Sequence, residues 1–371
     1  MVKKIIEKHR GILEKYGYPK EIHRLQEKLK KGEFTAESNI VKGKIRAPRK
    51  EELPRLPEKG ALAYETLKRI GADSITKSEV GVIILNGGMA TRFGGEVKGL
   101  VEVYDGRSFL RLKIENVKHV AERYHAWVPI FIMNSFQTEK ATEAFLQKHH
   151  NFDYPHIRHF NQLISIRLDE AGEVFHDAEG KPSFYAPGHG DFRYAFVNSG
   201  MLDHFLGQGG KYLFFSNGDN LAATLDPAII GFHIKSGNEM TTEVAAKDPG
   251  DRGGAPAVVD GKLQIVENFK FPKDFDQDTI PVMNTNSFVF TASALKKEIE
   301  LDWYAAIKDI DGRKAVQFER LVHEMSIHLM AGFVVVPKEG PDGRFIPIKL
   351  REYLDKYRAM LKEMLERRNH E

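Results

Sequence analysis

The sequence predicts an α/β fold: a mostly parallel central sheet flanked by helices, with helical N- and C-terminal segments. Three apolar runs, at 82–85, 128–133 and 212–215, lack polar alternation, which is typical of strands that are covered on both faces. Longer amphipathic stretches at 109–124 and 138–148 separate these runs. This alternation of strands and helices indicates parallel pairing, because a parallel connection needs a long crossover.

The flanking elements follow from the same kind of periodicity. Apolar residues recur at helical spacing over 1–38, again over 61–70, and in the tail from 350 to 371. Turn-rich, alternating stretches at 155–190 and 240–290 predict hairpins beside the sheet. We therefore expect three regions: a basic helical region at 1–78, the main α/β domain at 79–335, and a final segment at 336–371 that carries Lys349 and a helix.

Composition limits the class of protein. With 371 residues, 42% of them hydrophobic and 29% charged, the chain is ordinary globular material. A chain of this length buries about 75% of its unfolded surface, so it needs no disulfide or metal staple. It contains no cysteine, which excludes disulfides and thiolate metal sites and favours a reducing, cytoplasmic location. No apolar run approaches the roughly 18 residues of a membrane helix, so we expect no membrane partner.

Charge is distributed unevenly along the chain. Residues 1–60 hold 17 Lys or Arg against nine Asp or Glu, and the excess is greatest over 41–50. Such a run is compatible with an anionic partner such as nucleic acid. A solvated arm, or one close to a phosphorylated ligand, is the commoner meaning. Because no aromatic residues lie between these cations, we expect no nucleic acid partner.

The most informative segment follows the first strand. Residues 86–98 contain four glycines, a threonine and two cations, Arg92 and Lys98. Ligands bind at the carboxyl ends of strands in open α/β sheets, and glycines allow main-chain N–H groups to approach an anion. The spacing fits neither a Walker loop nor a dinucleotide fingerprint. The segment therefore predicts a phosphate-binding loop of another kind, with a tight connection that binds no ligand as the alternative.

A family resemblance becomes visible at this loop. The pattern Leu85-Asn86-Gly87-Gly88, followed by Thr91-Arg92 and Lys98, resembles the signature of sugar nucleotidyltransferases, in particular the UDP-glucose pyrophosphorylase (UTP–glucose-1-phosphate uridylyltransferase) branch. Two positions depart from it: Ala90 stands where the family has Gly, and Val97 where it has Pro. Further matches follow in the family's order, over 160–162, 186–191, 199–203, 215–226, 243–254, 267–272, 284–286 and 344–349, so that the resemblance covers 81 to about 355.

The resemblance implies a Rossmann-like fold and a reaction between UTP and a hexose 1-phosphate. A phosphate oxygen of the sugar attacks the α-phosphorus of UTP, and pyrophosphate leaves. The second pKa of a phosphate monoester is about 6, so the attacking group is already largely dianionic and needs no general base. Because two anions must meet, catalysis consists of in-line positioning and neutralisation of charge by Mg²⁺, Lys and Arg. The Pro187-Gly188-His189-Gly190-Asp191 segment favours an unsubstituted hexose over an N-acetylhexosamine.

The resemblance also implies roles for individual residues. The phosphates are assigned to Lys98, Arg92 and Lys349, and Mg²⁺ to Asp219. Nucleotide binding is assigned to the turn after the first strand and to two later positions, namely Leu85, Asn86, Gly87, Gly88, Thr91, Gln162 and Gly188. Sugar binding is assigned to His189, Gly190, Asn220, Glu243, Asn284 and Asn286.

Local chemistry supports several of these roles and leaves alternatives. Asp219 directly follows an apolar run, so its carboxylate is expected at the sheet edge, where Mg²⁺ takes hard oxygen ligands; a helix N-cap is the alternative. Gln162 has the donor and the acceptor that the uracil edge needs, or is a surface glutamine. Lys349 follows 345–348, which is expected to bury its stem and direct its ammonium inward; otherwise it ends an edge strand. Asn284 and Asn286 are sugar ligands or turn asparagines.

Other functions remain open at the level of sequence. The leading hypothesis is a Mg²⁺-dependent uridylyltransferase that makes UDP-glucose. A broader UDP-sugar pyrophosphorylase that takes galactose or N-acetylhexosamine phosphates uses the same chemistry. A non-catalytic nucleotide-sugar binding protein is conceivable because of Ala90 and Val97, but all the charged positions are retained, which favours an enzyme. The sequence indicates no oligomeric state.

Overall fold

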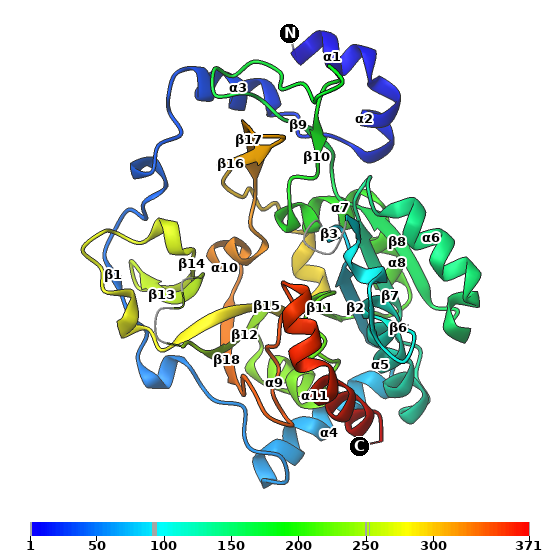
Figure 1. The fold of residues 1–371 in the computed structure, drawn as a ribbon. Coiled ribbons are helices and arrows are strands. Elements are labelled where there is room, and N and C mark those ends of the chain that lie inside the picture. The colour runs from blue at the N-terminus through cyan, green and yellow to red at the C-terminus, as the bar shows by residue number, and fades with distance from the viewer. Residues whose placement is uncertain (1, 91–94, 249–250, 252, 371) are drawn as a thin grey trace.

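The computed structural model describes residues 2–90, 95–248, 251 and 253–370, and a seven-stranded sheet forms its centre (Figure 1). The strands in spatial order are β18 (Ala331–Val336), β12 (Met240–Ala246), β15 (Val282–Thr291), β11 (Tyr212–Asn217), β2 (Val80–Leu85), β7 (Ile130–Asn134) and β8 (Ile157–Asn161). Strand β15 runs antiparallel to both of its neighbours, and the remaining neighbours pair in parallel. The predicted mostly parallel α/β sheet is confirmed.

Register brings the ends of the central strands to one edge. Asn217 at the end of β11 lies beside Leu85 at the end of β2, and Leu85 lies beside Met133 of β7. In the next pair, Asn134 lies beside Asn161. The residues that follow β2, β8 and β11 therefore meet at the same edge of the sheet.

Helices cover both faces of the sheet. The first face packs against α4 (Leu62–Thr76), α5 (Phe109–Arg123), α6 (Glu139–Lys148) and α9 (Pro227–Ser236), and the second against α7 (Phe192–Asn198), α8 (Met201–Gly207) and α10 (Met325–His328). Ile84 and Phe214 point to the first face, whereas Phe131 and Phe215 point to the second, which is the alternation expected of strands buried on both sides. The sequence had predicted α5 and α6 to within a residue or two.

The N-terminal helices lie apart from this core, at the top of Figure 1. The helices α1 (Val2–Lys8), α2 (Arg10–Tyr16) and α3 (Ile22–Lys30) lie near the pairs β9 (Ser165–Ile166)–β10 (Phe184–Tyr185) and β16 (Tyr304–Ile310)–β17 (Arg313–Glu319). Their buried residues Val2, Ile22 and Leu25 form a separate cluster with Val316 and Phe318. The predicted N-terminal helices are present, and the β9–β10 pair lies within the predicted hairpin stretch 155–190. The β16–β17 hairpin was not predicted, and the stretch 240–290, expected beside the sheet, contributes β12 and β15 to the central sheet as well as a hairpin over 255–266.

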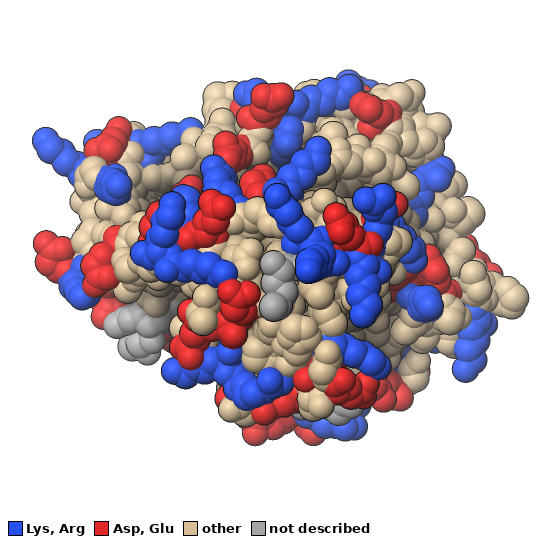
Figure 2. Space-filling model, turned by 90° about the horizontal axis from the view of Figure 1, so that it is seen from above, with Lys and Arg blue, Asp and Glu red and all other residues tan. Residues whose placement is uncertain are grey.

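The basic run at 41–50 is built into the fold. Strand β1 (Ile45–Arg46) pairs with β13 (Ala255–Val259), which continues into β14 (Lys262–Val266). Arg46 binds both carboxylate oxygens of Glu52, at 2.7 and 2.8 Å. Figure 2 shows that Lys and Arg are interspersed with Asp and Glu on the face seen from above. The pairing of β1 and the contact between Arg46 and Glu52 support a structural role for the run.

The tail forms the predicted helix α11 (Arg351–His370), which packs against α5 and β5 (Glu102–Tyr104) through Leu354, Leu361 and Leu365. The short strand β6 (Arg107–Ser108) pairs with β5. The boundary predicted near 78 stays a prediction, although Ile75 of α4 already belongs to the core around β2. Among the described residues, no helix has both the length and the apolar character to cross a membrane.

Candidate active site

A cavity of about 520 Å³ lies at the carboxyl edge of β2, β7, β8 and β11. Many of the residues singled out in the sequence line it together: Leu85, Asn86, Gly87, Gly88, Lys98, Gln162, Gly188, His189 and Asp219. The predicted Thr91 and Arg92 fall outside the described residues, so their roles stay predictions. The edge of the sheet where ligands are expected in such folds is therefore the edge that carries the cavity.

The turn after β2 is held from inside the fold. The Asn86 side chain donates to Asn134 Oδ1 at 2.9 Å and to Thr142 Oγ1 at 2.8 Å. Ser135 Oγ donates to the carbonyl of Gly87 at 3.0 Å. These buried bonds consume both donors of Asn86, so the side chain shapes the turn, and it is the main chain that faces the cavity.

Gln162 closes one end of the cavity beside Gly87. Gln162 is only 5% exposed, and a Cβ atom on Gly87 would lie 2.0 Å from its Nε2. A side chain at position 87 would therefore displace the Gln162 amide. The Oε1 atom of Gln162 is buried and has no hydrogen-bond partner within the described part of the chain. A buried acceptor left unpaired is costly, so this amide is suited to an N–H group of a ligand.

Lys98 and Asp219 form an ion pair at the other end of the cavity. Lys98 Nζ lies 2.5 Å from Asp219 Oδ2, and the two side chains are 20% and 21% exposed. The pairing of β3 (Met89–Ala90) with β4 (Glu96–Val97) brings Lys98 back to the turn, where its N–H donates to Gly88 at 3.2 Å. Asp219 is the one carboxylate among the described residues that line the cavity. This end therefore combines a cation and a hard oxygen donor.

Asp219 is positioned by main-chain contacts and caps no helix. Gly218 N–H donates to the carbonyl of Leu85 at 3.0 Å, and the carbonyl of Asp219 accepts from Ile348 N–H at 3.2 Å. The next helix, α9, is capped by Asp226, whose carboxylate accepts from Ala228 N–H at 2.8 Å. The alternative that Asp219 is an N-cap is wrong.

Lys349 directly follows Ile348, whose N–H donates to the carbonyl of Asp219, so its main chain lies close to Asp219 in space. Its side chain is exposed and does not line the cavity. The expectation of a buried stem with an inward ammonium is therefore wrong in this structure, because Ile346 and Ile348 fill the interior instead and Lys349 points the other way. Contact between Lys349 and a phosphate requires its flexible side chain to turn toward the cavity.

Two predicted sugar ligands are directed into the protein. The Asn220 side chain is fully buried, donates to the carbonyl of Arg344 at 3.0 Å and accepts from Ile346 N–H at 3.0 Å. Glu243 is 1% exposed and binds Arg344 through both oxygens, at 2.5 and 2.8 Å. Neither side chain contacts the cavity, since both are occupied in holding Arg344 and the segment around it.

The asparagines of β15 lie just outside the cavity. Asn286, with φ of +57°, donates through Nδ2 to Asn217 Oδ1 at 2.7 Å, and Asn217 lines the cavity. The side-chain oxygen Oδ1 of Asn284 accepts a hydrogen bond from Asn286 N–H at 2.9 Å. Both asparagines belong to β15 and not to a turn, Asn286 contacts the cavity wall through Asn217, and the sugar-binding roles stay predictions.

The turn that carries His189 and Gly190 forms another wall. Gly188 has φ of +96°, and a Cβ on Gly190 would lie 2.2 Å from the carbonyl carbon of Arg320, so the segment forms a tight turn packed against Arg320. His189 Nδ1 accepts from Val322 N–H at 3.1 Å. Burial lowers the pKa of His189 to about 4. The imidazole is therefore neutral at physiological pH and fits no role as a proton donor.

One wall of the cavity is formed by residues that the sequence did not single out. Arg167, Tyr185 and Gln317 line it from the hairpin region. Arg167 donates to Ser183 Oγ at 2.9 Å and to the carbonyl of Phe184 at 2.7 Å, and burial lowers its pKa. The only signal was a single cation within the apolar run Ile164, Ile166 and Leu168, which is not specific to any site.

No cluster of three or more His, Asp or Glu able to hold a metal occurs in the part of the chain that the structure describes. A metal at Asp219 would therefore take its other ligands from a substrate or from water. Mg²⁺ is often bound in this way, with one or two carboxylates and substrate phosphates.

Comparison with known proteins agrees with this geometry. The sequence profile of the UTP–glucose-1-phosphate uridylyltransferase family matches residues 27–356. The uridylyltransferase of that name from Musa acuminata is 29% identical over 361 residues, which cover 89% of this chain and 74% of the relative. The corresponding protein from Solanum tuberosum is 32% identical over 289 residues, with 72% and 58% covered. The chain thus spans roughly three fifths to three quarters of the length of these curated relatives.

Two solved structures have a fold similar to that of this chain. The crystal structure of UDP-glucose phosphorylase from Trypanosoma brucei superposes with a TM-score of 0.73 at 27% identity, covering 94% of this chain and 78% of that one. The UDP-N-acetylglucosamine pyrophosphorylase of the same organism shares the fold, with a TM-score of 0.70 at 21% identity over 82% and 69% of the two chains. With the profile match extending over most of its length, this chain belongs to the UTP–glucose-1-phosphate uridylyltransferase family.

Proposed function

We propose that this protein transfers the uridylyl group of UTP to glucose 1-phosphate, forming UDP-glucose and pyrophosphate, and that the reaction is reversible. The observation that carries the proposal is the cavity with the Gln162 amide at one end and the Lys98–Asp219 pair at the other. The two ends follow β8 and β11, which are three strand spacings apart, about 14 Å. That separation suits an extended nucleotide with its base at Gln162 and its phosphates at Lys98.

The proposed chemistry needs no proton transfer. A sugar phosphate oxygen forms a bond to the α-phosphorus of UTP as the bond to the bridging β-phosphate oxygen breaks, and the electron pair leaves with pyrophosphate. Lys98 neutralises charge on the phosphates, with Lys349 and Arg92 in the same proposed role. The neutral His189 shapes the wall in which the hexose would lie.

Mg²⁺ is proposed as the metal because Asp219 is a hard oxygen donor beside the proposed phosphate position. When bound, Mg²⁺ neutralises phosphate charge and orients the leaving group. Asp219 and substrate oxygens would hold it. In the structure Lys98 is the partner of Asp219, so the substrate phosphates must compete for the ammonium before the carboxylate can accept a metal.

The test is pyrophosphate release from UTP with a panel of sugar 1-phosphates, with and without Mg²⁺. We expect turnover with glucose 1-phosphate that depends on Mg²⁺. Comparable turnover with galactose or N-acetylglucosamine phosphates would replace this proposal with a broader pyrophosphorylase. UDP-glucose binding without turnover of any sugar would indicate a binding protein.

A further inference from the structure

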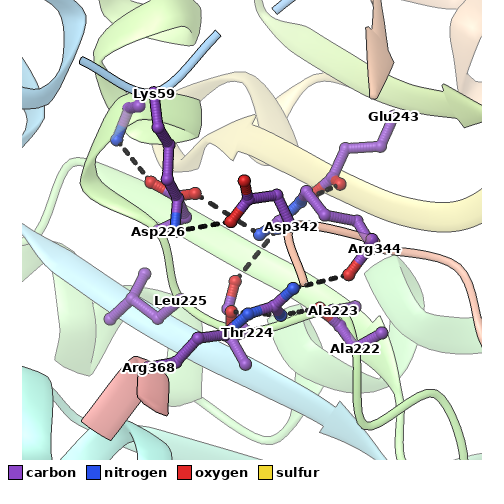
Figure 3. A network of polar contacts seen from close by, with 12 residues as sticks. Lys59, Ala222, Ala223, Thr224, Leu225, Asp226, Glu243, Asp342, Arg344 and Arg368 are labelled. Carbon is purple, nitrogen blue, oxygen red and sulfur yellow. Dashed lines mark hydrogen bonds and ion pairs between the residues drawn. The ribbon is translucent and has the colours of Figure 1, made fainter. Parts of the chain in front are cut away.

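Three consecutive carbonyl groups behind Asp219 each accept a hydrogen bond from a different cation. Arg368 Nη1 donates to Ala222 at 2.8 Å, Lys113 Nζ to Ala223 at 2.6 Å, and Arg344 Nη2 to Thr224 at 3.0 Å. Figure 3 shows the two arginines approaching this stretch from opposite sides. We call Lys113, Arg344 and Arg368 the cation cradle. The cradle lies on the connection between Asp219 and α9.

The three cations come from distant parts of the chain. Lys113 belongs to α5, Arg344 to the segment after β18, and Arg368 to α11. Lys113 and Arg344 are 4% and 3% exposed. Burial lowers the pKa of Lys113 to about 7 and that of Arg368 to about 10. Three separate elements therefore direct buried or partly buried cations at one short loop.

Burial of the Lys113 side chain is unfavourable for the stability of the fold. Its ammonium binds only neutral acceptors in the described structure, Ser216 Oγ at 3.1 Å and the carbonyl of Ala223. Burying a charge without an anionic partner is unfavourable, and an apolar residue of the same size often serves stability equally well. Stability alone thus gives little reason for a lysine here. Its two acceptors lie on either side of Asp219 in the chain, which suggests a positional role.

The cradle also joins the Asp219 loop to the segment that carries Lys349. Arg368 donates to the carbonyl of Gly343 at 2.6 Å, and Arg344 is anchored by the two oxygens of Glu243. A few residues further along this segment, Ile348 N–H donates to the carbonyl of Asp219. The loop and the segment are therefore held against each other from behind, while their other sides face the cavity edge and solvent.

We propose that Lys113, Arg344 and Arg368 are positioning residues that fix the carboxylate of Asp219 relative to residues 346–349 without touching substrate. This inference rests on the proposed uridylyl transfer. A displacement of about 1 Å at reacting groups can cost on the order of 10²-fold in rate. Loss of a cradle cation should therefore lower kcat. It should leave the KM for UTP nearly unchanged, because the Gln162 end of the cavity is fastened to β7 and not to the cradle.

The experiment uses Lys113→Met, Arg368→Met and Arg368→Lys. Two matched controls remove a cation-to-carbonyl bond from the same helices outside the cradle. They are Lys118→Met in α5, which loses a bond to Phe152, and Arg358→Met in α11, which loses a bond to Val103. We expect kcat to fall about 10- to 100-fold in the first two cradle variants, with the KM for UTP changed less than about threefold. Arg368→Lys should recover part of the loss, since one ammonium can still reach a carbonyl.

A second readout does not depend on turnover. Amide hydrogen exchange over 218–224 and 346–349 should accelerate in the cradle variants and not in the controls. Equal kcat in cradle and control variants, with unchanged exchange, would overturn the inference while leaving the proposed reaction intact. If the wild-type chain shows no turnover at all, the proposed reaction fails, and exchange alone then decides whether the cradle orders the loop. Lys113→Met and Arg368→Lys are close in size to the native residues, so a folded variant is available in either case.

Discussion

At the Gln162 end of the cavity, neutral groups contributed by neighbouring strands hold one another in place, whereas at the Asp219 end charged groups are brought together from across the chain. Asn86, Asn134 and Gln162 all lie at the ends of β2, β7 and β8. Asp219, Arg344 and Arg368 come from three separate segments. The proposed base-binding end can thus be built from the register of neighbouring strands, whereas the proposed phosphate-binding end depends on contacts between segments far apart in the sequence.

Asp219→Ala should have the largest effect. Removing the carboxylate breaks the ion pair with Lys98 and deprives the proposed Mg²⁺ of its protein ligand. We expect kcat to fall on the order of 10²- to 10³-fold, the size of effect that follows loss of one preorganised electrostatic contact. Steady-state turnover at saturating Mg²⁺ measures it, and thermal unfolding checks the fold. Asp203→Ala, which removes an exposed carboxylate paired with Lys296, is the control. Undiminished activity in the Asp219 variant would remove the metal assignment.

The substitution Gln162→Glu tests the opposite end of the cavity. The substitution removes the amide donor and places a carboxylate next to Gly87. A lost hydrogen bond of this kind costs about 2 kcal/mol, so the KM for UTP should rise roughly 30-fold while that for glucose 1-phosphate changes little. Initial rates with each substrate varied in turn separate the two constants. An equal rise in both would argue against a role in binding the base.

The sheet and the neutral end of the cavity were predictable for the same reason. Apolar runs mark β2, β7 and β11, and parallel strands end at one edge, so the residues after them must converge. The directions of polar side chains were not predictable. Asn220 and Glu243 sit within motifs of the site but bind Arg344, because a buried main-chain or charged partner lies nearer than the cavity. Arg167 belongs to a hairpin whose docking depends on tertiary packing.

Two adjacent glycines at the turn after β2 differ in what surrounds them. A Cβ on Gly87 would press on Gln162, whereas one on Gly88 meets nothing within 4 Å. Gly87→Ala should raise the KM for UTP about tenfold by displacing the amide, at a cost of about 1.4 kcal/mol. Gly88→Ala should have a clearly smaller effect in the same assay. If the two variants behave alike, the turn acts on the ligand through its main chain only, and the contact between Gly87 and Gln162 has no part in binding.

The smallest effect on turnover is expected from the titration of the buried histidine. Burial lowers the pKa of His189 to about 4, below the unfolded value near 6.5, so between these values the unfolded chain binds the extra proton. Stability should accordingly rise with pH through this window and be lost as pH falls, by about 2 kcal/mol between pH 7 and pH 5 for this group. Urea unfolding of wild type and His189→Asn at both pH values measures the difference. The variant should be less sensitive to acid than wild type, while His125→Asn at an exposed position should match wild type. A wild-type loss that His189→Asn leaves unchanged would show that the folded and unfolded chains protonate this imidazole over the same pH range, and burial would then not be what keeps it neutral between pH 5 and pH 6.5.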